Sequence, residues 1–180
     1  MMRISGLFII LIFLIWPTTF SHSSTPNRGP FKFGGDGSIA IFNTHLSELE
    51  TVKYRDGGGK YINSGLERLN WVLRCRLTNE PADMSIELIE LVDFIEDHFG
   101  AKEVDVISGY RSPKLNSTLK RTGHKVASNS LHLYGMAMDI RLPNVPLVKI
   151  RDLAKRLGVG GVGFYPGQFV HVDVGEVRYW

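Results

Sequence analysis

The stretch 130–140, SLHLYGMAMDI, holds His132 and Asp139 seven positions apart among mostly apolar residues. A carboxylate in such surroundings is costly to bury unless a cation or a hydrogen-bond donor meets it. The later run FVHVDV repeats the pattern, with His171 and Asp173 between apolar residues. Imidazole and carboxylate groups are common ligands of transition metals. These four residues are therefore the first candidates for chemistry.

Strand alternation predicts which of these side chains share a face. Successive residues of a strand point to opposite faces, so Asp139 lies opposite the methionines of MAMDI. In FVHVDV, His171 and Asp173 lie opposite the valines. If the two strands are neighbours, Asp139 and His171 converge, and His132 can join them from the preceding loop. Gly135 would permit the turn from that loop into the strand.

Two histidines and one carboxylate, with a fourth position open, are typical of a catalytic zinc site. Magnesium or calcium would need more oxygen ligands, and a structural zinc would need four protein ligands. Iron also uses two histidines and a carboxylate, so ligand types leave the metal open. In the simplest alternative, Asp139 forms a salt bridge with Arg111 or Arg141. The single cysteine, Cys75, cannot form an internal disulfide and is expected to be a small helix residue.

The length and charge of the chain limit the classes of protein to consider. Its 180 residues are enough for one domain with a proper core, and 43% of them are hydrophobic. The formal net charge is +3, and the basic residues are scattered rather than clustered. Nucleic-acid binding is therefore not expected. A modest positive charge would suit an anionic polymer, although a solvated mixed surface explains it equally well.

Residues 1–23 are predicted to be a signal peptide. Arg3 precedes the apolar run LFIILIFLIW, and small polar residues follow it. The run is short for a membrane-spanning helix, which needs about 20 residues. We expect export without stable membrane insertion after cleavage, and an uncleaved N-terminal anchor is the alternative. Residues 24–37, rich in Ser, Pro and Gly, are expected to be a flexible lead-in. The domain then comprises 38–180.

Hydrophobic periodicity places helices mainly early and strands mainly late, which favours an α+β fold. We expect a small antiparallel sheet that carries the metal site and is flanked by helices. Ser64 and Glu67 form a capping-box pattern at the start of the first helix. The expected strands are 38–45, 49–55, 104–108, 136–140, 161–165 and 169–175, and the expected helices are 66–77, 84–99, 113–121 and 145–157.

Three motifs carry a resemblance to a known family. SLHLYGMAMD fits Ser-x-His-x-x-Gly-x-Ala-x-Asp and resembles a signature of the D-Ala-D-Ala metallopeptidase group, zinc peptidases that include VanX-type dipeptidases and share their fold with hedgehog proteins. Upstream, ISGYRS resembles the segment that presents their active-site arginine. The ending GGVGFYPGQFVHVDVGEVRYW is similar to the MepK-type murein endopeptidase branch. The resemblance covers about residues 40–180.

The resemblance implies roles for four residues. His132, Asp139 and His171 match the ligands of one Zn²⁺ ion. Arg111 matches the arginine that binds a substrate carbonyl or an oxyanion, a task that suits a guanidinium in a site without water.

The general base is where the chain departs from the family pattern. Many relatives place an acid or a histidine two or three residues before the last zinc ligand, where this chain has Gln168 and Phe169. Asp173 is then expected to be the base or to orient His171. A third interpretation makes His171 the base and Asp173 the ligand.

The resemblance implies a zinc-dependent murein endopeptidase that hydrolyses peptidoglycan stem-peptide cross-links during cell-wall remodelling. One alternative is a D,D-carboxypeptidase that trims stem peptides. A second is a non-catalytic zinc-containing module that binds the cell wall. Export suits all three, because peptidoglycan lies outside the cytoplasm. We expect the periplasm, with an extracellular location as the alternative, and the oligomeric state stays open.

Overall fold

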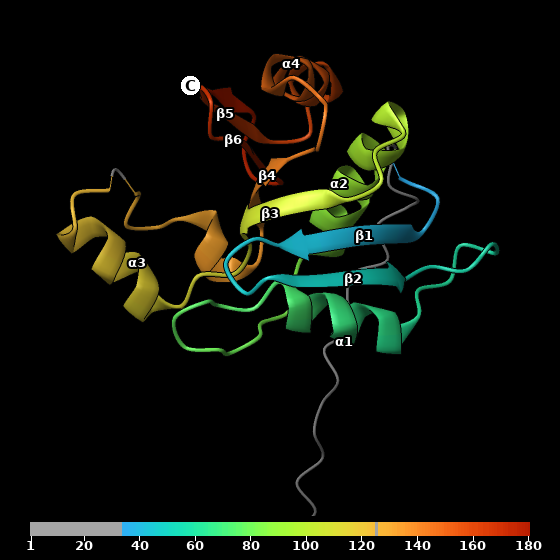
Figure 1. Ribbon diagram of the computed structural model, residues 1–180, viewed down its shortest axis with the longest axis horizontal. Coiled ribbons are helices and arrows are strands. Elements are labelled where there is room, and N and C mark those ends of the chain that lie inside the picture. The colour runs from blue at the N-terminus through green and yellow to red at the C-terminus, as the bar shows by residue number, and fades with distance from the viewer. Residues whose placement is uncertain (1–33, 125) are drawn as a thin grey trace, which may run out of the picture.

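The computed structural model describes residues 34–124 and 126–180 (Figure 1). The expected signal peptide and most of the expected lead-in lie outside the described residues. Within the described part of the chain, no helix combines the length and apolarity needed to cross a membrane.

A seven-stranded sheet forms the framework, in the order β2-β1-β3-β4-β6-β5-β7 (Figure 1). β1 pairs with β3, and β5 with β7, in parallel, whereas the other pairings are antiparallel. The strands are β1 (Ser38–Asn43), β2 (Glu48–Lys53), β3 (Val104–Ser108), β4 (Ala137–Arg141), β5 (Gly161–Tyr165), β6 (Phe169–Asp173) and β7 (Arg178–Tyr179).

The α+β class is confirmed, but the expectation of a small antiparallel sheet needs correction. The sheet is larger and mixed. β3 follows two helices, and such a long connection lets a strand return parallel to β1. β7 has only two residues, which is too short for a hydrophobic pattern to reveal.

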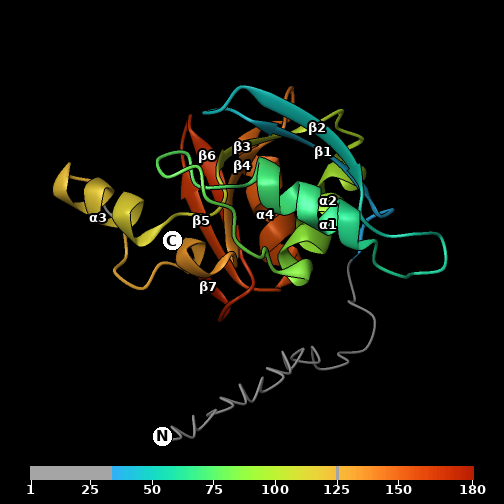
Figure 2. The same cartoon turned by 90° about the horizontal axis from the view of Figure 1, so that it is seen from below.

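Four α-helices accompany the sheet in the described residues: α1 (Asn63–Val72), α2 (Ile86–Phe99), α3 (Pro113–Arg121) and α4 (Leu147–Leu157). The sheet curves around α1, α2 and α4, while α3 stands apart at the side (Figure 2). Ser112 caps α3 by accepting a hydrogen bond from the Leu115 backbone N–H at 3.2 Å.

The predicted capping box at the start of α1 is wrong. The helix begins at Asn63, so Ser64 lies inside it, and the N-cap residue Ile62 offers no side-chain acceptor. α1 also ends at Val72, earlier than expected. Beyond it, the Arg74 side chain binds Asn79 Oδ1 at 2.6 Å, which secures a turn rather than another helical turn.

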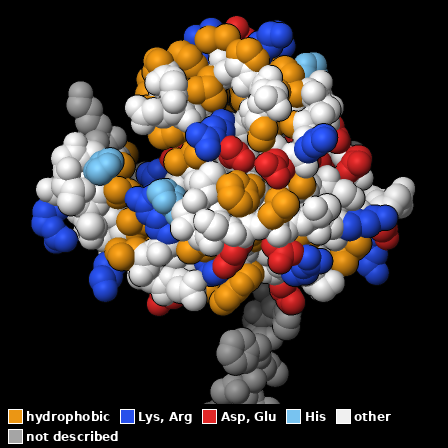
Figure 3. Space-filling model, in the orientation of Figure 1, with side chains coloured by type: hydrophobic (Ala, Val, Ile, Leu, Met, Phe, Trp, Pro, Cys, Tyr) orange, Lys and Arg blue, Asp and Glu red, His pale blue; other side chains and the backbone are white. Residues whose placement is uncertain are grey.

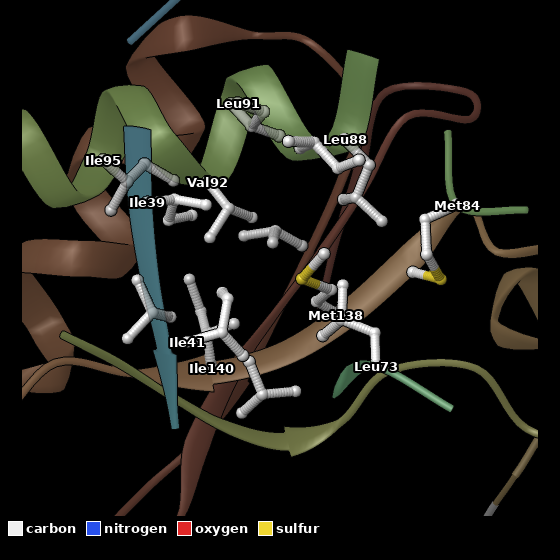
Figure 4. Packing of buried hydrophobic residues seen from close by; sticks show 14 of the residues in the cluster. Ile39, Ile41, Leu73, Met84, Leu88, Leu91, Val92, Ile95, Met138 and Ile140 are labelled. Atoms are coloured by element: carbon white, nitrogen blue, oxygen red, sulfur yellow. The ribbon is translucent and has the colours of Figure 1, made fainter. Parts of the chain in front are cut away.

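The hydrophobic core lies between the sheet and these helices. Met138 and Ile140 of β4 pack with Ile41 of β1 and with Val92 and Ile95 of α2 (Figure 4). The apolar face that alternation predicts for β4 therefore lies in the core. The opposite face of β4 is free to carry polar side chains.

Candidate active site

Asp139 and His171 stand directly opposite each other on the antiparallel pair β4 and β6. Asp139 Oδ1 lies 2.8 Å from His171 Nδ1. His132 Nε2 lies 3.2 Å from the same oxygen and 3.3 Å from His171 Nδ1. All three side chains are buried. The structure thus brings together the three residues that the sequence predicts as metal ligands.

A single turn of 3₁₀ helix, η1 (Leu131–Tyr134), delivers His132 to this point. Gly135 ends it with φ +65°, in the left-handed region that favours glycine. A Cβ at Gly135 would lie 2.3 Å from the carbonyl oxygen of Asp83. The chain therefore needs glycine here both for its backbone conformation and for its close approach to residue 83.

The second nitrogen of each histidine fixes the direction of its lone pair. His132 Nδ1 donates to the carbonyl of Gly109 at 2.8 Å, which leaves Nε2 as the acceptor. His171 Nε2 donates to Asp173 Oδ2 at 3.1 Å, which leaves Nδ1 as the acceptor. Two imidazole lone pairs and a carboxylate oxygen then converge on one point. Such outer hydrogen bonds are a regular feature of histidines that bind metals.

The spacing of these donor atoms suits a metal ion. Two ligands bound about 2.0–2.1 Å from a tetrahedral zinc lie about 3.3 Å apart. Two of the three separations in the cluster are 3.2 and 3.3 Å. Two facing imidazole lone pairs also repel each other unless a cation lies between them. The residues present therefore fit a metal with three protein ligands.

Burial and charge act differently on the three groups. Burial lowers the pKa of His132, which favours the neutral, ligating form. Burial acts against ionisation of Asp139, but His132, His171 and Arg111 outweigh it and hold the pKa of Asp139 well below its usual range. Burial also acts against protonation of His171, yet the flanking carboxylates raise its pKa. The cluster therefore attracts a cation, either a proton or a metal.

Asp173 lies behind His171 rather than in the cleft. Its Oδ1 accepts hydrogen bonds from the backbone N–H groups of Gly161 and Gly175, at 2.8 and 2.9 Å. Its Oδ2 receives Arg178 Nη2 at 2.7 Å as well as His171. Burial acts against its ionisation, but the bonds from His171 and Gly161 lower the pKa of Asp173 to about 2. A carboxylate held in this way suits the orienting role better than the general-base role.

Arg111 follows β3 and reaches the cluster from the side. Its Nε donates to Ser108 Oγ at 2.8 Å, and its Nη2 contacts Asp139 Oδ2. The backbone N–H of Arg111 donates to the carbonyl of His132 at 3.0 Å, so the two segments hold each other in place. The salt bridge to Asp139 that the sequence allows is present. Arg111 also lines the cleft.

An open cleft of about 460 Å³ lies over the cluster, between α3 on one side and β5 and β6 on the other. Figure 3 shows basic and histidine side chains gathering where the α3 region meets the rest of the molecule. The cleft is lined by both histidines and Asp139 of the cluster, by Arg76, Arg111 and Arg178, and by Tyr165, Phe169 and Trp180.

Sequence reasoning missed Trp180, which forms part of the cleft wall. Its ring centroid lies 5.2 Å from that of His171, and its Nε1 donates to Tyr165 Oη at 3.1 Å. Gly163 makes room for the indole, since a Cβ there would lie 2.6 Å from the Trp180 ring. The short strand β7 brings Trp180 to this position, so the signal lies in a tertiary contact.

A second group of carboxylates also has its oxygens within 4.8 Å of one another: Asp36, Asp93 and Asp97. It contains no histidine, and Asp36 and Asp97 are exposed. None of the three lines the cleft.

The model of the peptidase family M15_2, described as peptidoglycan L,D-endopeptidase MepK, matches residues 35–180. The chain belongs to this family. The match includes all three candidate metal ligands, and it confirms the expected branch, that of the murein endopeptidases. The M15 assignment also supports a peptidase that depends on a metal.

Two members of the MepK family show how far the similarity extends. A probable peptidoglycan L,D-endopeptidase MepK of Haemophilus influenzae is 40% identical over 118 residues, which are 64% of this chain and 63% of that protein. The peptidoglycan L,D-endopeptidase MepK of Escherichia coli K12 is 35% identical over 144 residues, 79% of each chain.

Proposed function

We propose that this protein is a zinc-dependent L,D-endopeptidase that hydrolyses stem-peptide cross-links in peptidoglycan. One observation carries the proposal: two histidines with fixed tautomers and one carboxylate converge at the floor of an open cleft. This donor set is that of catalytic zinc sites. The names of the MepK relatives supply the substrate and the class of bond. The expected signal peptide supports export, with the periplasm as the proposed location.

In this proposal His132, Asp139 and His171 hold the zinc ion. When bound, zinc polarises the scissile carbonyl and lowers the pKa of a water molecule to about 7. Arg111 supplies a fixed positive charge beside the reacting carbonyl, where it stabilises the developing oxyanion. Among the described residues, its Nη1 has no hydrogen-bond partner, which leaves a donor for substrate.

We assign Asp173 an orienting role. It holds the N–H of His171 and so keeps the opposite nitrogen aimed at the metal. Its ion pair with Arg178 and its two backbone hydrogen bonds leave it no place in the cleft.

Digestion of purified peptidoglycan by residues 24–180 tests the function. Released fragments are identified by mass spectrometry, with and without a chelator, and after zinc is restored. The proposal predicts fragments cut at L,D cross-links that vanish with chelator and return with zinc. Loss of a terminal alanine alone would indicate a carboxypeptidase. No product from a protein that holds one zinc ion would favour a wall-binding module instead.

A further inference from the structure

We propose that Arg76 binds a free carboxylate of the substrate and so selects stem peptides in which this group is not amidated. The inference rests on the proposed function, because it names a feature of the same substrate. Arg76 lies between α1 and α2, exposed to solvent, and lines the cleft.

The charges in the cleft single out Arg76. Within the described residues, the Arg, Lys, Asp and Glu side chains that line the cleft are Arg76, Arg111, Arg178 and Asp139. Arg111 pairs with Asp139, and Arg178 pairs with Asp173. Arg76 has no carboxylate within ion-pair distance in the part of the chain that the structure describes. Among the described residues, the cleft therefore presents one guanidinium whose charge is not compensated.

A neutral partner holds Arg76 in place. Its Nη1 contacts His45 Nε2 in the turn between β1 and β2. Burial and the charge of Arg76 both lower the pKa of His45, so the imidazole is neutral and accepts the hydrogen bond. His45 thus orients the guanidinium and leaves its positive charge intact, which favours binding of an anion.

Arg76 lies on the same side of the cleft as Arg111. Arg76, Ser108 and Leu115 line both the main cleft and a small hollow beside it. Ser108 also accepts the hydrogen bond from Arg111 Nε. Arg76 therefore flanks the side of the cleft from which Arg111 reaches the cluster. A peptide that places its scissile carbonyl near Arg111 can extend a neighbouring side chain toward Arg76.

The chemistry of the substrate matches this guanidinium. Stem peptides carry free carboxylates on their acidic residues, and amidation removes the negative charge. A guanidinium binds a carboxylate through two parallel charge-assisted hydrogen bonds, whereas it gains much less from a neutral amide. Arg76 would thereby distinguish the two forms.

The test uses two synthetic stem-peptide dimers joined by the same L,D cross-link, one with free carboxylates and one with these groups amidated. Wild type, Arg76→Ala, Arg76→Glu and, as a matched control, Arg156→Ala are compared by kcat/KM. Arg156 is an exposed arginine of α4 that does not line the cleft. Zinc content and thermal melting establish that each variant folds and holds metal.

We expect the wild type and Arg156→Ala to prefer the free form by about tenfold, the scale of one charge-assisted interaction. Arg76→Ala should lose this preference through a higher KM for the free dimer, and Arg76→Glu should prefer the amidated dimer. Equal losses on both dimers, or an unchanged preference in Arg76→Ala, would overturn the inference.

Binding separates this inference from the proposed function. The dissociation constants of both dimers are measured by calorimetry, which needs no turnover. If the wild type cleaves neither dimer but still binds the free form more tightly, and Arg76→Ala does not, the function fails and the carboxylate site stands. If Kd is the same for both forms in the wild type, the carboxylate site fails.

Discussion

Asp139 Oδ1 and His171 Nδ1 lie 2.8 Å apart at one register position of β4 and β6. An isolated contact of this kind would be an ordinary ion pair. His132 argues against a simple ion pair, because its Nε2 lies 3.3 Å from the same nitrogen of His171. Each of the two rings donates its other N–H to a different acceptor. Two facing lone pairs and a carboxylate fit a site for a metal ion.

Replacing His132 with glutamine should abolish stoichiometric zinc binding. The change removes the imidazole lone pair that completes the cluster. His124→Gln is the matched control, because His124 lines the cleft but does not belong to the cluster. Zinc per protein after dialysis, measured by mass spectrometry, should fall close to zero in the first variant only. Equal zinc content in the two variants would refute the assignment.

Asp173→Asn distinguishes an orienting role from a general base. In Asp173 the charged oxygen Oδ2 accepts hydrogen bonds from both His171 Nε2 and Arg178 Nη2. A neutral amide at this position loses the negative charge that strengthens both bonds. An orienting role predicts a loss of zinc affinity of about 10–100-fold. A general base predicts unchanged zinc affinity with lost turnover. Competition with a fluorescent chelator measures the affinity, and a saturating-zinc assay measures the turnover.

Arg111→Lys should lower kcat about 100-fold or more, since the substitution keeps the charge but loses the guanidinium fork that faces Ser108 and Asp139. Zinc content should stay at one ion per chain. Arg141→Lys provides the comparison: Arg141 pairs with Asp105 on the same sheet, outside the cleft. If both variants keep wild-type kcat, Arg111 is structural.

Glu96 and Asp93 should each contribute a fall in the free energy of unfolding as pH rises from about 4 to about 7. Burial raises the pKa of Glu96 to about 7 and that of Asp93 to about 6, above the ordinary values of 4.5 and 3.8 for these carboxyl groups. In this window these two carboxyl groups therefore bind more protons in the folded state than in the unfolded state, and their deprotonation favours unfolding.

Glu96→Gln should flatten this dependence. A tenfold change in proton affinity corresponds to about 1.4 kcal/mol, so the part removed with Glu96 is on the order of 3 kcal/mol. Glu67→Gln, at an exposed position of α1, should leave the slope unchanged. Urea titrations between pH 4 and 8 give the free energies, and an unchanged slope in Glu96→Gln would contradict the prediction.

The meeting of His132, Asp139 and His171 could be predicted because it depends on short-range rules. Strand alternation puts Asp139 and His171 on the polar faces of β4 and β6, and Gly135 lets the chain turn between His132 and the strand. The sequence could not supply the distances. Those follow from the register of β4 against β6, which depends on packing across the whole sheet.

The features that sequence reasoning missed depend on tertiary contacts rather than on periodicity along the chain. The ion pair of Asp173 with Arg178 and the packing of Trp180 over Gly163 both require β7 to join the edge of the sheet. The same holds for Arg76, whose role depends on His45 from another turn. None of these contacts has a local pattern in the sequence.

The most direct test is an anomalous difference map from crystals of the zinc-loaded protein, with data collected on both sides of the zinc absorption edge. The account predicts one peak at about 2.0–2.2 Å from His132 Nε2, His171 Nδ1 and an oxygen of Asp139. A principal peak at Asp36, Asp93 and Asp97, or no peak in a zinc-loaded crystal, would contradict it.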